Sequence, residues 1–275
     1  MKKILLNPWT ALLTLAIILL IKMLNPTFVE SVKLRYFDTL ITSQPDKVVP
    51  VNVVNIDEAS LDKYGQFPFP RDIYAQIIQD IYKRNAGLVV FNVLMPEKDR
   101  FNKDNVLAKT LEQYPVVLPA LGSTKSKNKN VGSPVQVVGQ DPDSYLVEYP
   151  GYITSVNEIS DRAAGVGIVN TFPEVDGVVR RMPLLILVPD TNVVPLDQQQ
   201  KIAHPALALE ALRVGSGDNK IQVKITDMGV EALRIPKLAK IQTDNLSRMW
   251  IDYRDRKSTR LNSSHTDISR MPSSA

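Results

Sequence analysis

The chain has 275 residues, enough for one large domain or two small ones, and 44% of them are apolar, which suits a globular core. Its formal net charge is only +4 and its Lys and Arg residues form no stripe, which argues against a nucleic-acid partner. The absence of cysteine excludes disulfides, a Cys-ligated zinc and a cysteine nucleophile.

The chain opens with a segment that the sequence predicts to be a membrane anchor. Two N-terminal lysines precede an apolar run over residues 9–24. Counted from Ile4, with Lys22 snorkelling outward, the run reaches the roughly 17–25 residues that span a bilayer. A cleaved signal peptide is the alternative, but no small-residue cleavage site follows the run. We therefore predict an uncleaved inner-membrane anchor over residues 1–28. Its N-terminus is expected in the cytoplasm, although basic residues beyond the run weaken this orientation.

Residues 29–41 form an amphipathic stretch directly after the predicted anchor. Val32, Tyr36, Phe37 and Leu40 can share one helical face. The pattern predicts a stalk helix that continues from the anchor.

Strand and helix patterns alternate after the stalk. The β-branched run VVPVNVVNI is typical of a strand, and apolar residues at helical spacing follow the sequence FPFPR. The alternation indicates a parallel sheet with covering helices. The predicted elements are strands at residues 48–56, 88–94 and 115–121, and helices at residues 67–87 and 102–114.

The second half is predicted to be richer in strands. Residues 122–142 are polar and are predicted to form a surface loop or insertion. Two strands over residues 165–188 are joined by a turn at Asp176-Gly177, and a helix is expected to begin at His204-Pro205. Later strands are predicted at residues 219–225, 230–236 and 248–254. The fold class is therefore α/β, a largely parallel sheet with covering helices plus a later β-rich part, in one domain over residues 29–254.

The last 21 residues differ in character from the rest of the chain. Residues 255–275 are polar and lack strand or helix periodicity. The letters DRKSTRLNSSH at residues 255–265 and SRMPSSA at residues 269–275 match the translation of a common sequencing adapter on either side of its variable index. A disordered natural tail is the alternative. We predict that residues 255–275 are an adapter artefact and that the natural sequence is truncated near Arg254.

Four segments carry a resemblance to a known family. They are the stalk VKLRYFDTLI, the stretch VNIDEASLDKYGQFPFPR, the stretch AGLVVFNVLMPEKDRFNKDNVLAKTL, and GVGIVNTFPEVDGVVRRMPLL with its Gly-x-x-Asn and Asp-Gly-x-x-Arg-Arg patterns. Together, in this order, they resemble the CHASE domain of the second type, found before bacterial nucleotide cyclases and histidine kinases. The resemblance covers roughly residues 29–254.

The resemblance implies a receptor. The chain is expected to be the extracytoplasmic input domain that senses an unknown signal or protein, in a homodimer held by the membrane. Its output, a nucleotide cyclase or histidine kinase, is expected beyond Arg254, so this fragment is not expected to be an enzyme. The alternatives are a membrane-tethered periplasmic enzyme using Asp57, Arg71 and Asp176, and a partner-binding envelope protein.

Five residues are candidates for ligand binding or signalling. Asp57 and Asn92 are expected at the carboxyl ends of adjacent parallel strands, where open α/β sheets bind ligands. The family usually has Asp at the position of Asn92, so a role needing two acids there is in doubt. Arg71 is expected to pair with Asp57 or an anionic ligand, or else to fix the loop in a buried Arg–carboxylate network.

The Asp-Gly-x-x-Arg-Arg segment supplies the other two candidates. These candidates are Asp176 and Arg180. Arg180 is expected to meet the acids at the sheet edge; the alternative is that the segment only forms a turn. Arg181 is expected on a solvated strand face. His204 is a lone histidine and a poor metal ligand, so no metal, cofactor or catalytic residue is predicted.

Overall fold

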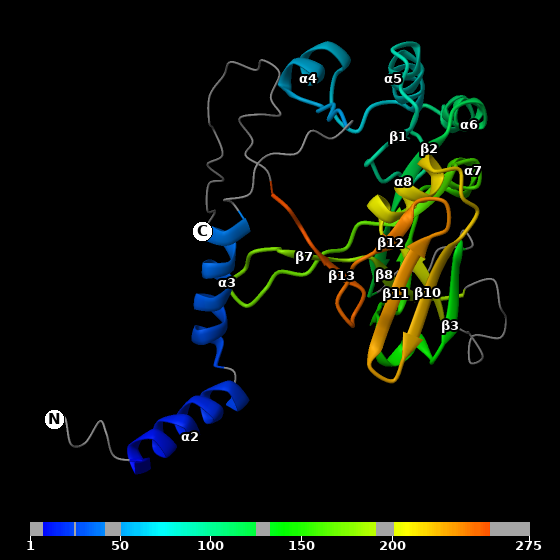
Figure 1. Cartoon of the computed structure of the whole chain (residues 1–275). Helices are drawn as coiled ribbons and strands as arrows, with labels where there is room; N and C mark the ends of the chain where they lie inside the picture. The colour runs from blue at the N-terminus through cyan, green and yellow to red at the C-terminus, as the bar shows by residue number, and fades with distance from the viewer. Residues whose placement is uncertain (1–7, 25, 42–50, 125–132, 191–200, 254–275) are drawn as a thin grey trace. The chain divides into compact units, whose positions relative to one another are not determined.

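The computed structural model describes residues 8–24, 26–41, 51–124, 133–190 and 201–253 (Figure 1). The chain divides into two compact units, one formed by residues 1–52 with 251–275 and the other by Val53–Trp250. The adapter-like tail at 255–275 lies outside the described residues, as does Arg254.

The first unit contains two helices, α2 (Pro8–Leu24) and α3 (Thr27–Ile41). Helix α3 confirms that residues 29–41 are helical, but it is a helix separate from α2, so its role as a stalk that continues from the anchor stays a prediction. In the described residues, no helix alone has the length and apolar composition to cross a membrane; α2 and α3 meet that requirement only together, with a bend between them. The anchor over residues 1–28 therefore stays a prediction.

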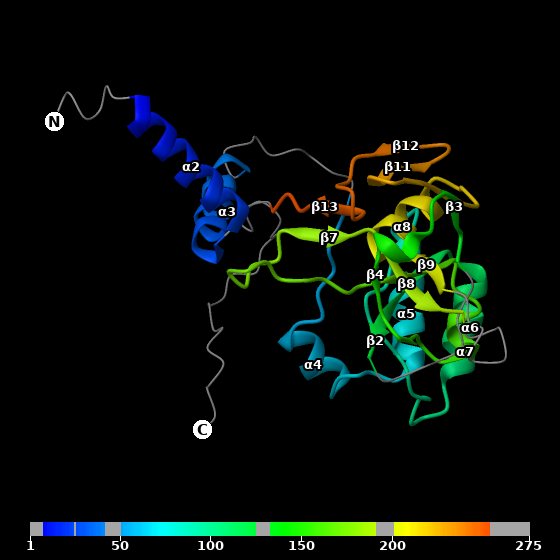
Figure 2. The ribbon, with the colours of Figure 1, turned by 90° about the horizontal axis from the view of Figure 1, so that it is seen from below.

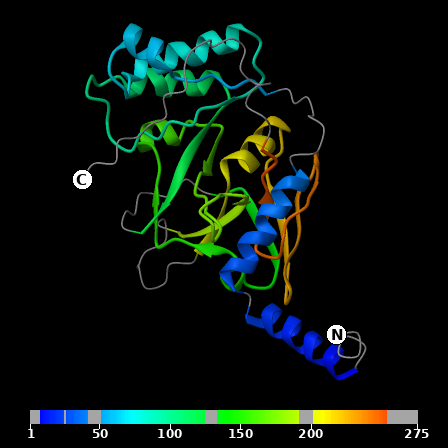
Figure 3. The ribbon, with the colours of Figure 1, turned by 90° about the vertical axis from the view of Figure 1, so that its left-hand side faces the viewer.

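The second unit, Val53–Trp250, combines helices with several small sheets. Figure 1 and Figure 3 show α5, α6 and α7 gathered at one end of this unit and the long strands β10 and β11 extending away from them. Its helices are α4 (Glu58–Tyr64), α5 (Arg71–Lys83), α6 (Asp104–Gln113), α7 (Asn157–Ser160) and α8 (Leu207–Gly215), with a 3-10 turn η1 (Pro142–Ser144).

The first sheet carries the parallel part of the fold. Strand β2 (Val116–Ser123) pairs in parallel with β1 (Val89–Val90) and β6 (Gly165–Ile168), and antiparallel with β5 (Gly151–Ile153). Helices α5 and α6 pack on β1 and β2 through one apolar cluster that includes Tyr74, Ile78, Val89, Leu107 and Leu118. The expected parallel sheet with covering helices is thus present in β1, β2 and β6, and further parallel pairs join β3 to β10 and β4 to β8.

The second sheet has the order β12-β11-β10-β3, from β12 (Ala239–Ile241), β11 (Gly229–Ile235), β10 (Ile221–Thr226) and β3 (Val135–Gly139). A three-stranded sheet runs β4-β8-β9, from β4 (Val147–Glu148), β8 (Leu185–Pro189) and β9 (Lys201–Pro205). These two sheets and α8 share a second apolar core. A separate two-stranded ribbon joins β7 (Arg181–Pro183) to β13 (Arg248–Trp250) (Figure 2).

Three sequence-based expectations are wrong. The described part of the predicted strand 48–56 has no regular structure and pairs with nothing, because strand propensity alone supplies no partner for the backbone. The polar stretch 122–142 is not only loop: it contains β3, which pairs in parallel with β10. His204 lies inside β9 and not at a helix start, since residues 201–205 pair with β8 and the helix begins at Leu207.

The turn at Asp176-Gly177 exists but does not close a hairpin between the strands on either side. Strand β6 pairs with β2, whereas β7 pairs with β13. Tertiary packing explains this difference. Strand β6 lies against α8, where Gly167 leaves room for the helix backbone, and the backbone of β6 hydrogen-bonds to β2. Each strand therefore pairs with a strand that is distant in the sequence and not with its neighbour in the sequence.

Candidate functional site

The Asp-Gly-x-x-Arg-Arg segment forms a tight turn that leads into β7. The Gly177 amide donates to the Glu174 carbonyl at 2.9 Å, and the Glu174 amide donates to the Val178 carbonyl at 2.9 Å. Gly177 has φ of 81°, a left-handed conformation that favours glycine. The turn therefore brings the side chains before and after it, Glu174 and Asp176 on one side and the two arginines on the other, close together.

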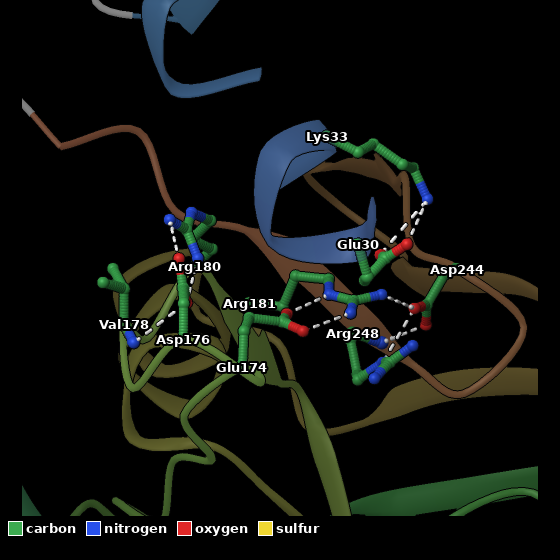
Figure 4. Close-up of polar contacts among 9 residues, drawn as sticks. All are labelled: Glu30, Lys33, Glu174, Asp176, Val178, Arg180, Arg181, Asp244 and Arg248. Atoms are coloured by element: carbon green, nitrogen blue, oxygen red, sulfur yellow. Dashed lines mark hydrogen bonds and ion pairs between the residues drawn. The ribbon is translucent and has the colours of Figure 1, made fainter. Parts of the chain in front are cut away.

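Asp176 and Arg180 form a two-point ion pair across this turn. Both terminal nitrogens of Arg180 donate to separate carboxylate oxygens of Asp176 at 2.7 Å (Figure 4). The Asp176 and Arg180 side chains are only 8% and 5% exposed. Hydrogen bonds from Arg180 lower the pKa of Asp176 to about 2, so the carboxylate stays ionised.

Arg181 makes the second two-point contact of the cluster. Its Nε and a terminal nitrogen donate to the two carboxylate oxygens of Glu174 at 2.6 and 2.7 Å. The same contact lowers the pKa of Glu174. The guanidinium also lies 5.0 Å above the Trp250 ring, a cation–π arrangement within the ribbon. Arg181 is therefore engaged at the ribbon, and its expected placement on a solvated strand face is wrong.

Asp244, in the loop before β13, and Arg248, the first residue of β13, also belong to the cluster. Arg248 Nε donates to Asp244 at 2.8 Å, and Arg181 approaches the same carboxylate at 3.7 Å (Figure 4). Asp244 also accepts from the Leu246 and Arg248 amides at 3.0 and 2.8 Å. These contacts link the loop to β7 through Arg181.

We call Glu174, Asp176, Arg180, Arg181, Asp244 and Arg248 the arginine cluster. Its three carboxylates and three guanidinium groups balance in charge, and every carboxylate accepts from an arginine. The lowered pKa values of Asp176 and Glu174 make these two carboxyl groups poor proton donors near neutral pH. The cluster is suited to fixing the turn against the ribbon of β7 and β13.

The other predicted site residues lie in separate networks. Asp57 caps α4: its Oδ1 accepts from the Ser60 amide at 3.0 Å and the Ser60 hydroxyl at 2.7 Å. These hydrogen bonds lower the pKa of Asp57. Asn92 follows β1 and is exposed. No strand forms before Asp57 in the described residues, so the expected meeting of Asp57 and Asn92 at adjacent strand ends is not found.

Arg71 is buried and does not pair with Asp57. Its Nε donates to Asp104 at 3.3 Å, and a terminal nitrogen donates to the Glu97 carbonyl at 3.1 Å. The other oxygen of Asp104 accepts from the Asp99 amide at 2.8 Å. This is the predicted alternative of a buried Arg–carboxylate network that fixes a loop, with Asp104 as the carboxylate. Arg180 likewise meets Asp176 of its own turn and not the acids at the sheet edge.

The Gly-x-x-Asn pattern also has a structural role. The Asn170 side chain accepts from the Gly122 amide at 2.7 Å and donates to the Gly122 carbonyl at 3.0 Å. A Cβ atom on Gly167 would lie 2.4 Å from the Leu207 Cα, so glycine allows α8 to approach β6. Both residues fix the packing of the sheet.

Sequence reasoning missed three of the six residues of the arginine cluster, Glu174, Asp244 and Arg248. Asp244 and Arg248 are 63 and 67 residues from Arg181 in the sequence, and a single sequence carries no sign that they meet. Successive side chains along a strand point to opposite faces, and this alternation in the predicted strand was the one sign that Arg180 and Arg181 have different partners. Within the described ranges no group of three or more His, Cys, Asp or Glu side chains could hold a metal ion.

The comparisons with known proteins identify one family. A family model described as the CHASE2 domain matches residues 12–273. No curated protein and no solved structure matches the chain. The matched range runs into the adapter-like tail, so the origin of residues 255–275 stays a prediction.

Proposed function

The chain belongs to the CHASE2 domain family of extracytoplasmic sensory domains, and we propose that it is the signal-sensing input of a transmembrane receptor anchored in the inner membrane by residues 1–28. The observation that carries the proposal is the family match over nearly the whole chain. The output, a nucleotide cyclase or histidine kinase, would lie outside the sequence given.

We propose that the two N-terminal helices, which meet at a bend, form a relay through the membrane. Helix α3 follows α2 closely in the sequence and has a hydrogen-bonded start, where the Val29 and Glu30 amides donate to the Pro26 carbonyl at 2.9 and 3.2 Å. A helix transmits displacement along its axis because its backbone bonds are all internal. We propose that α3 passes a change in the sensory unit to the anchor.

We also propose that the receptor is a homodimer. The predicted stalk face contains Val32, Tyr36 and Leu40, and these side chains are 51%, 66% and 50% exposed. Their spacing of four residues places them along one side of α3. An apolar stripe of this kind suits contact between two parallel stalks.

The arginine cluster is our candidate for the response to the signal. Asp176 and Arg180, both predicted from the sequence, form its most buried ion pair. A ligand or protein that offered a carboxylate to Arg180 would compete with Asp176 and release the turn. Asp57, Arg71 and Asn92 lie outside this cluster and remain predictions as ligand residues.

The enzyme alternative gains no support from the side-chain contacts. Asp57 bonds to Ser60, Arg71 to Asp104, and Asp176 to Arg180, so the three proposed catalytic residues belong to three different networks. The partner-binding alternative is compatible with the exposed stripe on α3, and the proposed homodimer already accounts for that stripe.

The topology can be tested by cysteine labelling because the chain contains no cysteine. Met228 is 82% exposed in the turn between β10 and β11, so Met228→Cys reports on the sensory unit, whereas Lys2→Cys reports on the N-terminus. With a membrane-impermeant maleimide on cells with a permeable outer membrane, we expect Met228→Cys to be labelled before lysis and Lys2→Cys only after it. Labelling of Met228→Cys only after lysis would place the domain in the cytoplasm and contradict the proposal.

A further inference from the structure

A hollow in the second unit shares no residue with the arginine cluster. It lies where the loop after β1 meets the start of α7, at the end of the unit where Figure 1 shows α5, α6 and α7. Its volume is about 460 Å³, within the roughly 300–1,000 Å³ of small-molecule sites. Two segments of the chain line it, through Pro96, Lys98, Ser155, Val156, Asn157 and Glu158. The size suits a small ligand.

Met95 joins the two walls of this hollow. Its amide donates to Ser155 Oγ at 3.3 Å, and its carbonyl accepts from the Val156 amide at 2.9 Å. Met95 is buried, so the two hydrogen bonds are shielded from water. The two segments, 60 residues apart in the sequence, are therefore fixed against each other without a ligand.

The loop that contains Lys98 is anchored on both sides of this residue. On one side, the Glu97 carbonyl accepts from Arg71 at 3.1 Å. On the other side, the Asp99 amide donates to Asp104 at 2.8 Å. Arg71 and Asp104 are themselves a buried ion pair. The backbone around Lys98 is thus held in place, whereas the residue itself is exposed.

Two opposite charges line the hollow without pairing. Lys98 and Glu158 are both exposed, and neither side chain has an ion-pair partner in the part of the chain that the structure describes. They also do not pair with each other. A molecule with both a carboxylate and an ammonium group would give each of these charges a partner, through charge-assisted hydrogen bonds.

A buried hydroxyl adds a donor to the same hollow. Ser155 is 1% exposed, and its Oγ accepts from the Met95 amide. Over the described ranges, no acceptor takes the proton of this hydroxyl. Buried donors normally have an acceptor, because an unmade hydrogen bond is costly. The Ser155 hydroxyl is therefore available to donate to a ligand oxygen.

We propose that this hollow binds a free α-amino acid with an apolar side chain. The Lys98 ammonium and the Ser155 hydroxyl bind its carboxylate, and the Glu158 carboxylate accepts from its ammonium group. Pro96 and Val156 contact its side chain. That this amino acid is the signal of the receptor rests on the proposed function, whereas the binding itself does not.

The test is calorimetric titration of the full chain, purified in detergent, with L-alanine, L-valine and L-leucine in turn. We expect a dissociation constant of about 1 mM or tighter for at least one of them. The tightest ligand is then compared with analogues that lack one charge. For L-valine these are isovalerate, without the ammonium group, and isobutylamine, without the carboxylate. Each analogue should bind at least about tenfold more weakly, because it leaves one charged group of the site without a partner.

Variants locate the binding site. Lys98→Met and Glu158→Gln remove the two charges at exposed positions, and each should weaken binding at least about tenfold. Lys103→Met, in the same loop as Lys98, and Asp161→Asn, directly after α7, are the matched controls, because both are exposed and do not line the hollow. They should change the dissociation constant by less than about twofold. Circular dichroism and thermal unfolding without ligand check that each variant folds.

Three results would overturn the proposal. The first is that none of the three amino acids binds, and the second is that an analogue with a single charge binds as tightly as the amino acid. The third is that Lys98→Met or Glu158→Gln binds as tightly as the controls. None of these outcomes depends on the side of the membrane on which the domain lies, which the labelling of Met228→Cys tests separately. Failure here and failure of the receptor proposal are therefore distinguishable.

Discussion

Asp176 and Arg180, four residues apart, face each other across Gly177 with two parallel hydrogen bonds of 2.7 Å. The pair links the sequence pattern Asp-Gly-x-x-Arg-Arg to a specific geometry. The glycine permits the turn, the turn juxtaposes the two side chains, and the planar guanidinium matches both carboxylate oxygens. The next arginine in the pattern, Arg181, repeats this geometry with Glu174.

The ion pair predicts a specific acid sensitivity. The folded-state pKa of Asp176 is about 2, below the ordinary value of 3.8, so its stabilising effect is present above pH 3.8 and is lost as the pH falls toward 2. Asp176→Asn should lower the urea midpoint at pH 6. The difference between Asp176→Asn and the unsubstituted chain should shrink between pH 4 and pH 2. A difference that stays constant over this range would contradict the role of the ionised carboxylate.

His204 predicts a second pH dependence, at higher pH. The residue is 1% exposed and its ring packs against that of Tyr152 in a tilted arrangement, with ring centroids 4.9 Å apart. Neither ring nitrogen has a hydrogen-bond partner among the described residues. Burial lowers the pKa of His204 from 6.5 to about 4. A depressed histidine pKa means that the unfolded state binds the proton more readily, so stability is lost as the pH falls from 6.5 toward 4.

The expected size of this effect can be measured by urea unfolding. Between pH 7 and pH 5 the free energy of unfolding should fall by about 2 kcal/mol because of His204. His204→Phe keeps a ring against Tyr152 and should remove most of this slope, whatever its effect on absolute stability. His265 is present in both proteins, so its titration cancels in the comparison. An unchanged slope in the variant would show that another group is responsible.

Gly167 predicts a steric limit where α8 meets β6. An added Cβ would lie 2.4 Å from the Leu207 Cα and 2.7 Å from its nitrogen, and backbone atoms cannot move aside as a side chain can. Gly167→Ala should destabilise the protein by about 1–3 kcal/mol. Gly87→Ala is the matched control, since nothing lies within 4 Å of its added Cβ, and it should change stability by less than about 0.5 kcal/mol. Equal effects in thermal unfolding would disprove the close approach.

Arg181 predicts that charge alone does not hold the ribbon of β7 and β13. Arg181→Lys keeps the charge but loses the two-point contact with Glu174 and the guanidinium that lies 5.0 Å above the Trp250 ring. We expect a loss of about 1–2 kcal/mol in urea unfolding. Arg162→Lys, at an exposed pair with Glu112, should cost less than about 0.5 kcal/mol. If Arg181→Lys lowers the free energy of unfolding no more than this control does, the two-point geometry contributes nothing to stability.

The sequence alone determined the elements whose signal is local. Apolar residues at helical spacing gave α3, α5 and α6, and runs of β-branched residues gave β2 and β10, because these patterns show directly which face is buried. The turn at Asp176-Gly177 could also be predicted, because glycine adopts positive φ readily and this preference belongs to a single residue.

Only the tertiary structure decided which partner each element and side chain has. The sequence could not assign Asp104 to Arg71, or Asp244 to the neighbourhood of Arg181, because those contacts depend on how distant segments pack. The same reason explains why β6 and β7 do not pair with each other, and why the strand pattern at 53–56 lies unpaired. Strand propensity is a local property of the chain, whereas a strand exists only when another backbone satisfies its hydrogen bonds.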